Sequence, residues 1–236
     1  MTPLVLLPGM MCDARLFLPQ VAAIHDRAVT VAPITGADTT AALAEAVLAH
    51  APPRFALAGL SMGGIVAMEV FARAPERVAG LCLMDTNPKA EHPVVAEGRA
   101  PQMARVEAGG LRAVMRDEMK PNYLADGPHR GAILDTCMAM AEALGPDVFL
   151  RQSRALRSRP DRQEALRGVA VPALVLCGRE DALCPIHRHE LMHGLIAGSR
   201  LVVLEGAGHL PTLEAPEAVT AHLRDWLAAV DAAEAA

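Results

Sequence analysis

Six short apolar runs, separated by longer stretches with helical spacing, restrict the fold of this chain more than any other feature. The runs are nearly continuous in hydrophobic residues, as strands buried on both faces of a parallel sheet are. Alternation of such strands with helices predicts an α/β fold with a doubly wound, mostly parallel sheet of about six strands. The expected strands are Leu4–Leu7, Ala28–Ala32, Phe55–Ala58, Val78–Met84, Ala173–Cys177 and Arg200–Leu204.

Helices are expected between these strands and after the last one. Apolar residues recur at helical spacing in Thr39–His50 and in Gly63–Arg73. A third helix is expected at Pro216–Val230, because proline followed by an acidic residue is a common helix start.

The alternation of expected strands and helices is interrupted between Pro88 and Pro160, where no convincing strand is present. A structureless loop of roughly 70 residues is not expected inside a compact domain. We therefore expect a helical lid at residues 88–160, inserted into an α/β core made of residues 1–87 and 161–236. Helices in the lid are expected at Val94–Ala108, Leu111–Met119, Arg130–Leu144 and Asp147–Arg157.

Composition argues against several classes of function. Aromatic residues make up 3% of the chain and the net charge is −5, so we expect no binding to nucleic acid or to acidic membranes. Five cysteines without C-x-x-C spacing favour free thiols in a reducing compartment. The apolar run Leu4–Leu7 lacks the features of a signal peptide and is too short to span a membrane. A cytoplasmic enzyme is the expectation.

The segment Gly59–Gly63, with the sequence G-L-S-M-G, carries the strongest chemical signal. It lies between an expected strand and an expected helix, the context in which a G-x-S-x-G pattern forms a nucleophile elbow. Side chains at Gly59 and Gly63 would collide with neighbouring backbone in so tight a turn. Ser61 would then stand at the apex, exposed to substrate. The alternative interpretation is a glycine-rich turn with an incidental serine.

A serine nucleophile needs a base and a carboxylate that orients the base. His209 follows the last expected strand in a glycine-flanked loop, and Asp181 follows the strand before it. Both therefore lie at carboxyl ends of parallel strands, where such sheets build active sites. Two other carboxylates stay open for the acidic role: Glu180 beside Asp181, and Asp85 after the fourth strand.

The oxyanion of an acyl-transfer intermediate needs two backbone N–H groups. Met62, directly after the nucleophile, is expected to supply one, and Met10 in the loop after the first strand is expected to supply the other. A plain turn at Pro8-Gly9 is the alternative for that loop. Three further residues are expected to contact the substrate: Gly9, Met11 and Leu210.

Taken together, these motifs resemble the α/β-hydrolase superfamily. The resemblance covers nearly the whole chain except the lid, and within the superfamily the chain is similar to small bacterial carboxylesterases of the pimeloyl-carrier-protein methyl esterase and 3-oxoadipate enol-lactonase type. It implies a triad of Ser61, Asp181 and His209 in that chain order, with Met10 and Met62 as oxyanion donors. The matching segments are Leu6–Met10, Gly59–Gly63, Asp181 four residues before Pro185, and Gly208-His209 followed by Glu214–Glu217.

Two departures from this family pattern stand out. The oxyanion loop of relatives usually reads His-Gly, whereas this chain has Pro8-Gly9, so a histidine hydrogen bond that normally braces the loop is lost. The customary β-hairpin before the first strand is also absent.

The expected function is that of a serine carboxylesterase acting on small to medium acyl esters through an acyl-enzyme, with no metal and no organic cofactor. The expected partner is a small ester or lactone. A lactonase, a thioesterase and a catalytically slow ligand receptor stay open as alternatives. The pocket should be mostly apolar, lined by Met10, Met62 and lid side chains that include Met103, Met115, Met119, Met138 and Met140.

Three further features have plainer interpretations. His187, His189 and His193 have a weakly metal-like spacing, but a solvated helix face explains them. Cys184, near Asp181, is interpreted as a packing residue. Six arginines interrupted by acids indicate another solvated face, although an acidic carrier protein or a coenzyme A phosphate stays open as their ligand: Arg151, Arg154, Arg157, Arg159, Arg162 and Arg167.

Overall fold

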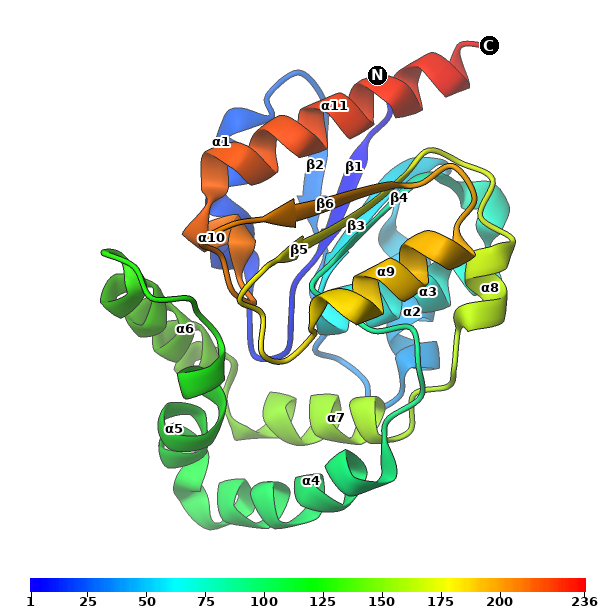
Figure 1. The fold of residues 1–236 in the computed structure, drawn as a ribbon. Coiled ribbons are helices and arrows are strands. Elements are labelled where there is room, and N and C mark those ends of the chain that lie inside the picture. Colours follow the sequence, from blue (N-terminus) through cyan, green and yellow to red (C-terminus); the bar gives the residue numbers. More distant parts are fainter.

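The computed structural model describes all 236 residues, and its centre is a six-stranded sheet with helices on both faces (Figure 1). All five pairs of neighbouring strands are parallel, in the order β2-β1-β3-β4-β5-β6. The expected doubly wound α/β fold is confirmed. The strands are β1 Leu4–Leu7, β2 Val29–Val31, β3 Phe55–Leu60, β4 Val78–Met84, β5 Ala173–Gly178 and β6 Arg200–Leu204.

Alternate side chains of each central strand enter two separate apolar clusters. In β1, Val5 and Leu7 join one cluster, whereas Leu4 and Leu6 join the other. Burial on both faces is the physical reason that these strands read as continuous apolar runs. The edge strand β2 is the exception: it is shorter than the expected Ala28–Ala32 and only partly buried.

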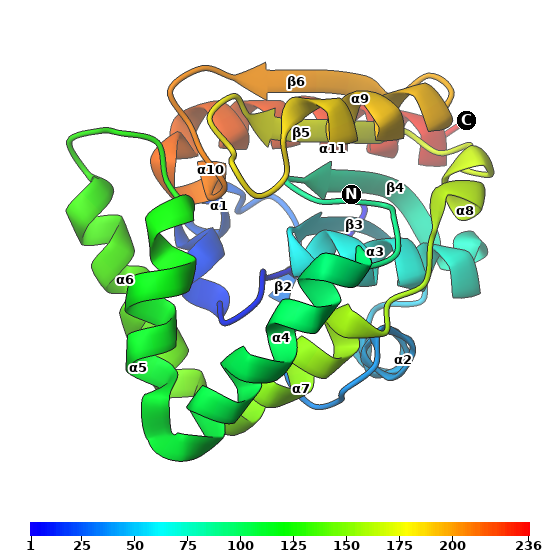
Figure 2. The same ribbon diagram turned by 60° about the horizontal axis from the view of Figure 1, so that its bottom comes forward.

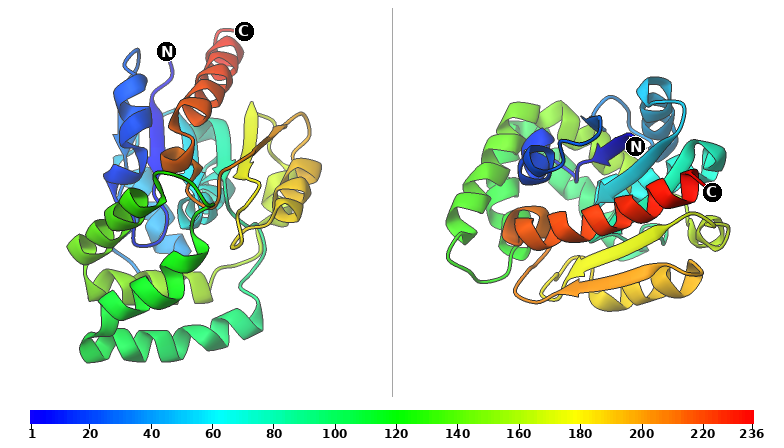
Figure 3. Two further views of the ribbon diagram at one scale, coloured as in Figure 1. Left: turned by 60° about the vertical axis from the view of Figure 1, so that its left-hand side comes forward. Right: turned by 90° about the horizontal axis from the view of Figure 1, so that it is seen from above.

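Helices of the core cover the two faces of the sheet (Figure 3). Helices α2, α3, α8 and α9 pack on one face, and α1 and α11 pack on the other. The sequence did not predict α1, α8 and α10, which are short. The helices of the core have the bounds α1 Leu18–Ala23, α2 Thr40–His50, α3 Met62–Arg73, α8 Gln163–Arg167, α9 Ile186–Leu195, α10 Pro211–Glu214 and α11 Pro216–Glu234. None of these or the other helices combines the length and the apolar character that a membrane span requires.

The chain between β4 and β5 forms further helices, which lie beyond the carboxyl ends of the strands (Figure 2). One correction concerns the first of them: the helix expected to reach Ala108 ends at Arg105, and wider helical turns follow, with Gly109 at φ +90°. The helix expected over Leu111–Met119 is likewise regular only to Val114. The bounds are α4 Pro93–Arg105, α5 Leu111–Val114, α6 Arg130–Leu144 and α7 Pro146–Arg157.

The turn from β3 to α3 brings the helix directly against the sheet. A Cβ at Gly63 would lie 1.9 Å from the carbonyl oxygen of Leu7 in β1, and a Cβ at Gly59 would lie 2.3 Å from the carbonyl oxygen of Gly63. These distances leave no room for a side chain at either position. The two glycines therefore fix where α3 begins and where the residue between them points.

We predict that Gly63→Ala destabilises the fold by more than about 2 kcal/mol, because the clash is with backbone that cannot move aside. Gly98→Ala is the matched control: Gly98 lies inside α4 and has nothing within 4 Å of a new Cβ. In that helix the change should stabilise the protein by about 0.5–1 kcal/mol. Urea denaturation followed by circular dichroism measures both. Equal stability of the two variants would contradict the close packing described here.

Candidate active site

Ser61 stands at the apex of the turn between β3 and α3. Its backbone has φ 55° and ψ −116°, a conformation that residues with side chains rarely adopt. Two hydrogen bonds hold it there: the Ser61 N–H donates to the Met84 carbonyl (2.9 Å), and the Thr86 hydroxyl donates to the Ser61 carbonyl (2.7 Å). Neighbouring strand β4 and the loop after it thus maintain the strained conformation.

The structure brings Ser61, His209 and Asp181 into one hydrogen-bonded chain. His209 Nε2 lies 2.9 Å from Ser61 Oγ, and His209 Nδ1 lies 2.8 Å from Asp181 Oδ2. An ionised carboxylate can only accept hydrogen bonds, so Nδ1 must donate to it. That tautomer leaves Nε2 as the acceptor for the serine proton.

The environment of Asp181 keeps its carboxyl ionised. Burial raises the pKa of Asp181, but the contact with His209 and two backbone N–H groups outweigh burial, so the pKa lies below its usual value. Those N–H groups belong to Leu183 and Cys184 and donate to Asp181 Oδ1 over 2.8 and 2.9 Å. An ionised Asp181 can stabilise an imidazolium on His209.

Neither of the other two carboxylates contacts His209. Asp85 is fully buried, and its Oδ1 accepts a hydrogen bond from the Gly178 N–H (2.9 Å) while its Oδ2 has no partner. Burial, followed by the charge of Asp181, raises the pKa of Asp85 well above its usual range, which favours a neutral carboxylic acid. Glu180 is exposed and makes only a long contact with the Gly206 N–H (3.4 Å).

The loop that carries His209 is held by contacts that the sequence did not reveal. The His209 N–H donates to the Tyr123 carbonyl (2.7 Å). The Glu214 carboxylate accepts from the N–H groups of Gly208, Leu210 and Ala125 over 3.0, 2.9 and 2.8 Å. Glu214 therefore ties the histidine loop to the segment between β4 and β5. In the sequence, the only indication of a role for Glu214 was that it belongs to the family motif that follows His209.

The two expected oxyanion donors have free N–H groups. Met62 is the first residue of α3, where helix N–H groups have no intrahelical acceptor. The Met10 N–H donates to no protein acceptor, whereas the next residue, Met11, donates its N–H to Gln152 Oε1 (2.8 Å). Gln152 is fully buried in α7, and its Nε2 donates to the Ile34 carbonyl (3.0 Å).

Gln152 thus braces the loop after β1 through a side-chain hydrogen bond from α7. It joins residues 141 positions apart in the chain. No local pattern marks it, so sequence reasoning missed it.

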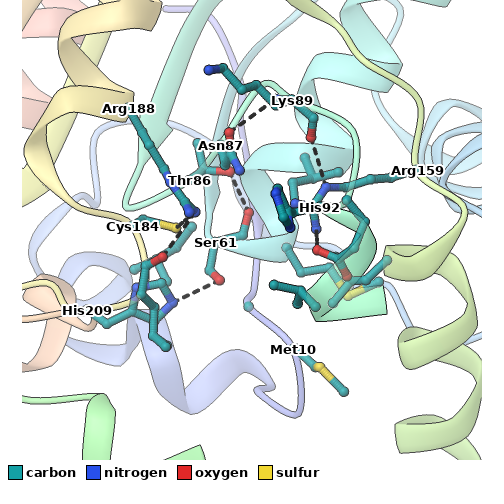
Figure 4. Close-up of a pocket in the computed structure, with 18 of the residues that line it drawn as sticks. Met10, Ser61, Thr86, Asn87, Lys89, His92, Arg159, Cys184, Arg188 and His209 are labelled. Carbon is teal, nitrogen blue, oxygen red and sulfur yellow. Dashed lines mark hydrogen bonds and ion pairs between the residues drawn. The ribbon is translucent and has the colours of Figure 1, made fainter. Parts of the chain in front are cut away.

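A cavity of about 930 Å³ opens beside Ser61 and His209 (Figure 4). Gly9 and Leu210 line it, as expected of substrate-contacting residues, but Met11 does not. Met11 is 1% exposed and has φ 55°, because its N–H turns towards Gln152 and its side chain packs in the core. That expectation is corrected here.

The walls of this cavity are only partly as expected. Met10 and Met62 line it, but Met119 is the only one of the five inserted methionines that does. Apolar residues share the lining with a group of charged and polar side chains, which the sequence analysis did not anticipate: Lys89, Glu91, His92, Arg99, Arg159, Asp161, His187 and Arg188.

The three histidines near the acid loop do not converge on one point. His189 is buried and its Nε2 accepts from the Thr86 N–H (3.1 Å), while His193 Nδ1 pairs with the Ser199 hydroxyl (2.8 Å). Asp181, Cys184 and His209 do bring their ligand atoms within 4.8 Å of one another. Burial raises the pKa of the Cys184 thiol, which disfavours the thiolate that a metal would need.

Most of the arginines between residues 151 and 167 are occupied by contacts within the protein. Arg159 pairs with Glu91 and Arg162 with Glu69, each over 2.6 Å. Arg151 donates to the Thr35 carbonyl (2.8 Å). Arg157 is exposed and makes no ion pair. The stretch as a whole is therefore not a free basic surface.

Comparisons with known proteins identify the family of this chain. Residues 4–222 match the model of the alpha/beta hydrolase family. A pimeloyl-acyl-carrier-protein methyl ester esterase of Neisseria meningitidis is 30% identical over 196 residues, covering 80% of this chain and 75% of the relative. The solved structure of a thermophilic esterase from Thermogutta terrifontis, with malate bound, has a TM-score of 0.89 at 29% identity and covers 98% of this chain and 90% of its own.

The family match spans almost the whole chain, which therefore belongs to the alpha/beta hydrolase family. This confirms the expected family and the expected class of enzyme, a hydrolase. An enol-lactonase from Burkholderia xenovorans shares the fold with a TM-score of 0.85 at 23% identity, over 96% of this chain and 91% of its own.

We predict that Asp181→Asn lowers turnover of nitrophenyl acetate by a factor on the order of 10⁴, because the amide favours the wrong tautomer of His209. Asp85→Asn is the matched control, since a neutral Asp85 resembles the amide, and it should cost far less. Steady-state kinetics on both variants decides the matter. A larger loss in Asp85→Asn would assign the acidic role to Asp85.

A second prediction concerns His189, whose pKa burial lowers to about 4. Such a histidine stays neutral in the folded protein but takes up a proton in the unfolded chain. The free energy of unfolding of the protein therefore falls as the pH drops below about 6.5. Between pH 7 and pH 5 the wild type should lose about 2 kcal/mol more than His189→Gln does. Urea denaturation at the two pH values measures this, with His50→Gln, at an exposed helix end, as the control. Equal losses in wild type and His189→Gln would show that His189 titrates normally.

Proposed function

We propose that this hydrolase is a serine carboxylesterase that cleaves small to medium acyl esters. The observation that carries the proposal is the chain of hydrogen bonds from Ser61 through His209 to Asp181 at the wall of a cavity of about 930 Å³. Two of the similar proteins are named esterases, which supports ester bonds as the target.

In the first step Ser61 Oγ attacks the ester carbonyl carbon while His209 Nε2 takes the serine proton. The resulting imidazolium is stabilised by ionised Asp181. The N–H groups of Met10 and Met62 donate to the tetrahedral oxyanion. His209 then gives its proton to the leaving alcohol, and an acyl-enzyme on Ser61 remains.

In the second step a water molecule replaces the alcohol. His209 takes a proton from the water, which attacks the acyl-enzyme and forms a second oxyanion between the same donors. Return of the proton to Ser61 Oγ releases the acid. The chain's own residues perform every step, and no metal or organic cofactor takes part.

Residues 88–160 act in this proposal as a lid over the core formed by residues 1–87 and 161–236. The lid would do more than cover the cavity, because Gln152 braces the oxyanion loop and the Tyr123 carbonyl holds the histidine loop. The proposed compartment is the cytoplasm, in keeping with five buried cysteines that form no disulfide.

Lactones and thioesters would react through the same tetrahedral oxyanion and the same acyl-enzyme on Ser61, and they remain alternative substrates. The Neisseria relative is named for a substrate attached to a carrier protein. The mostly paired arginines of residues 151–167 give little support for carrier binding here. A panel of short acyl esters, lactones and thioesters, compared by kcat/KM, separates these substrates.

We predict that Ser61→Ala lowers ester turnover by a factor on the order of 10⁴ or more, because the Ser61 hydroxyl is the group within hydrogen-bond distance of His209 Nε2. A fluorophosphonate probe should label wild type once, at Ser61, as read by peptide mass spectrometry. Ser158→Ala, at the end of α7, is the control and should behave as wild type. Labelling at another serine, or near-normal turnover in Ser61→Ala, would reject the proposed nucleophile.

A further inference from the structure

The lining of the cavity carries an excess of positive charge. Four cationic side chains line it against two carboxylates, although the chain as a whole has a net charge of −5. A concave site with one sign of charge concentrates ligands of the opposite sign. The cations are Lys89, Arg99, Arg159 and Arg188, and the carboxylates are Glu91 and Asp161.

Two of the arginines share a single carboxylate. The Glu91 side chain, 4% exposed, is paired with Arg99 Nε on one side and with Arg159 Nη1 on the other, the latter over 2.6 Å. Arg159 Nε donates to the Lys89 carbonyl (3.0 Å), while its Nη2 has no partner in the protein. One positive charge of this largely buried group therefore lacks a counter-charge, an arrangement that is costly unless an anion approaches.

Arg188 has no acidic partner. It extends from α9 towards the side of the cavity where Cys184 and Asn87 lie (Figure 4). Its Nη1 donates to the Leu183 carbonyl (3.0 Å) and lies 3.9 Å from Cys184 Sγ. The remaining donors, Nε and Nη2, have no acceptor in the protein, and together they form the planar fork that matches a carboxylate.

The same cavity is also lined by apolar side chains. Met10, Ile65 and Leu156 are among them, so a short methylene chain can be buried in the cavity while a charged end contacts the arginines. Ser61, which lies in the same cavity, would meet an ester group on such a molecule.

We propose that the ester hydrolysed here carries a carboxylate, and that its class is the monoesters of short dicarboxylic acids. Arg188 binds the carboxylate through Nε and Nη2, and the Arg99–Glu91–Arg159 group and Lys89 supply the surrounding positive field. The inference rests on the proposed esterase function and names the substrate class of that site. Hydrolysis adds water across the ester bond and yields a dicarboxylate, an alcohol and a proton.

The test compares monomethyl adipate, which is anionic at neutral pH, with uncharged dimethyl adipate, by pH-stat at low ionic strength. Wild type should favour the monoester in kcat/KM by on the order of 10-fold or more, the range expected of a charge-assisted hydrogen bond. Arg188→Gln should reduce this ratio at least about 10-fold, and Arg188→Lys, which keeps the charge but not the fork, should fall between. Arg157→Gln removes the same charge outside the cavity and should leave the ratio unchanged.

A ratio near or below one in wild type, or one that Arg188→Gln does not change, would overturn the carboxylate site while leaving the esterase proposal intact. Binding of adipate to Ser61→Ala protein, measured by calorimetry, tests the site without turnover. Adipate should bind Ser61→Ala and fail to bind when Arg188→Gln is added. If binding follows Arg188 but wild type hydrolyses no ester, the carboxylate site stands and the esterase proposal is wrong.

Discussion

The packing of α3 against the sheet is the constraint on which the rest of the site depends. Gly63 lies against the Leu7 carbonyl so closely that α3 can begin at only one place, and Ser61 is forced to a positive φ at that point. Two hydrogen bonds stabilise this strained conformation: the Thr86 hydroxyl donates to the Ser61 carbonyl, and the Ser61 N–H donates to the Met84 carbonyl. A reactive side chain is thus held rigidly in an unfavourable conformation by an extended parallel sheet, which supplies the stability that the turn lacks.

The segment between β4 and β5 is joined to the core at the points where chemistry is proposed. Gln152 fixes the loop beside the free Met10 N–H, and Tyr123 and Glu214 fix the backbone around His209. A change in this segment would therefore alter the proposed oxyanion donors and the base as well as access to the cavity. Specificity and catalytic geometry are coupled because buried hydrogen bonds connect them.

Two buried carboxyl groups, Asp181 and Asp85, have pKa values shifted in opposite directions because their surroundings differ. Asp181 receives two backbone N–H groups and faces His209, which hold its pKa low. Asp85 receives one N–H, is more deeply buried and faces the charge of Asp181, which hold its pKa high. Asp181 is therefore suited to stabilise an imidazolium, whereas the surroundings of Asp85 favour the neutral acid.

The sequence by itself determined the parallel sheet, the elbow around Ser61 and the position of Asp181 and His209 at carboxyl ends of strands. These features follow from local patterns, since a strand buried on both faces is apolar throughout and parallel strands end at the same edge. Only the tertiary structure decided which carboxylate contacts His209, that Met11 turns away from the cavity, and that Gln152 and the Arg99–Glu91–Arg159 group exist. Those contacts join segments far apart in the chain, and their partners are chosen by packing, which leaves no periodic or short-range trace in the sequence.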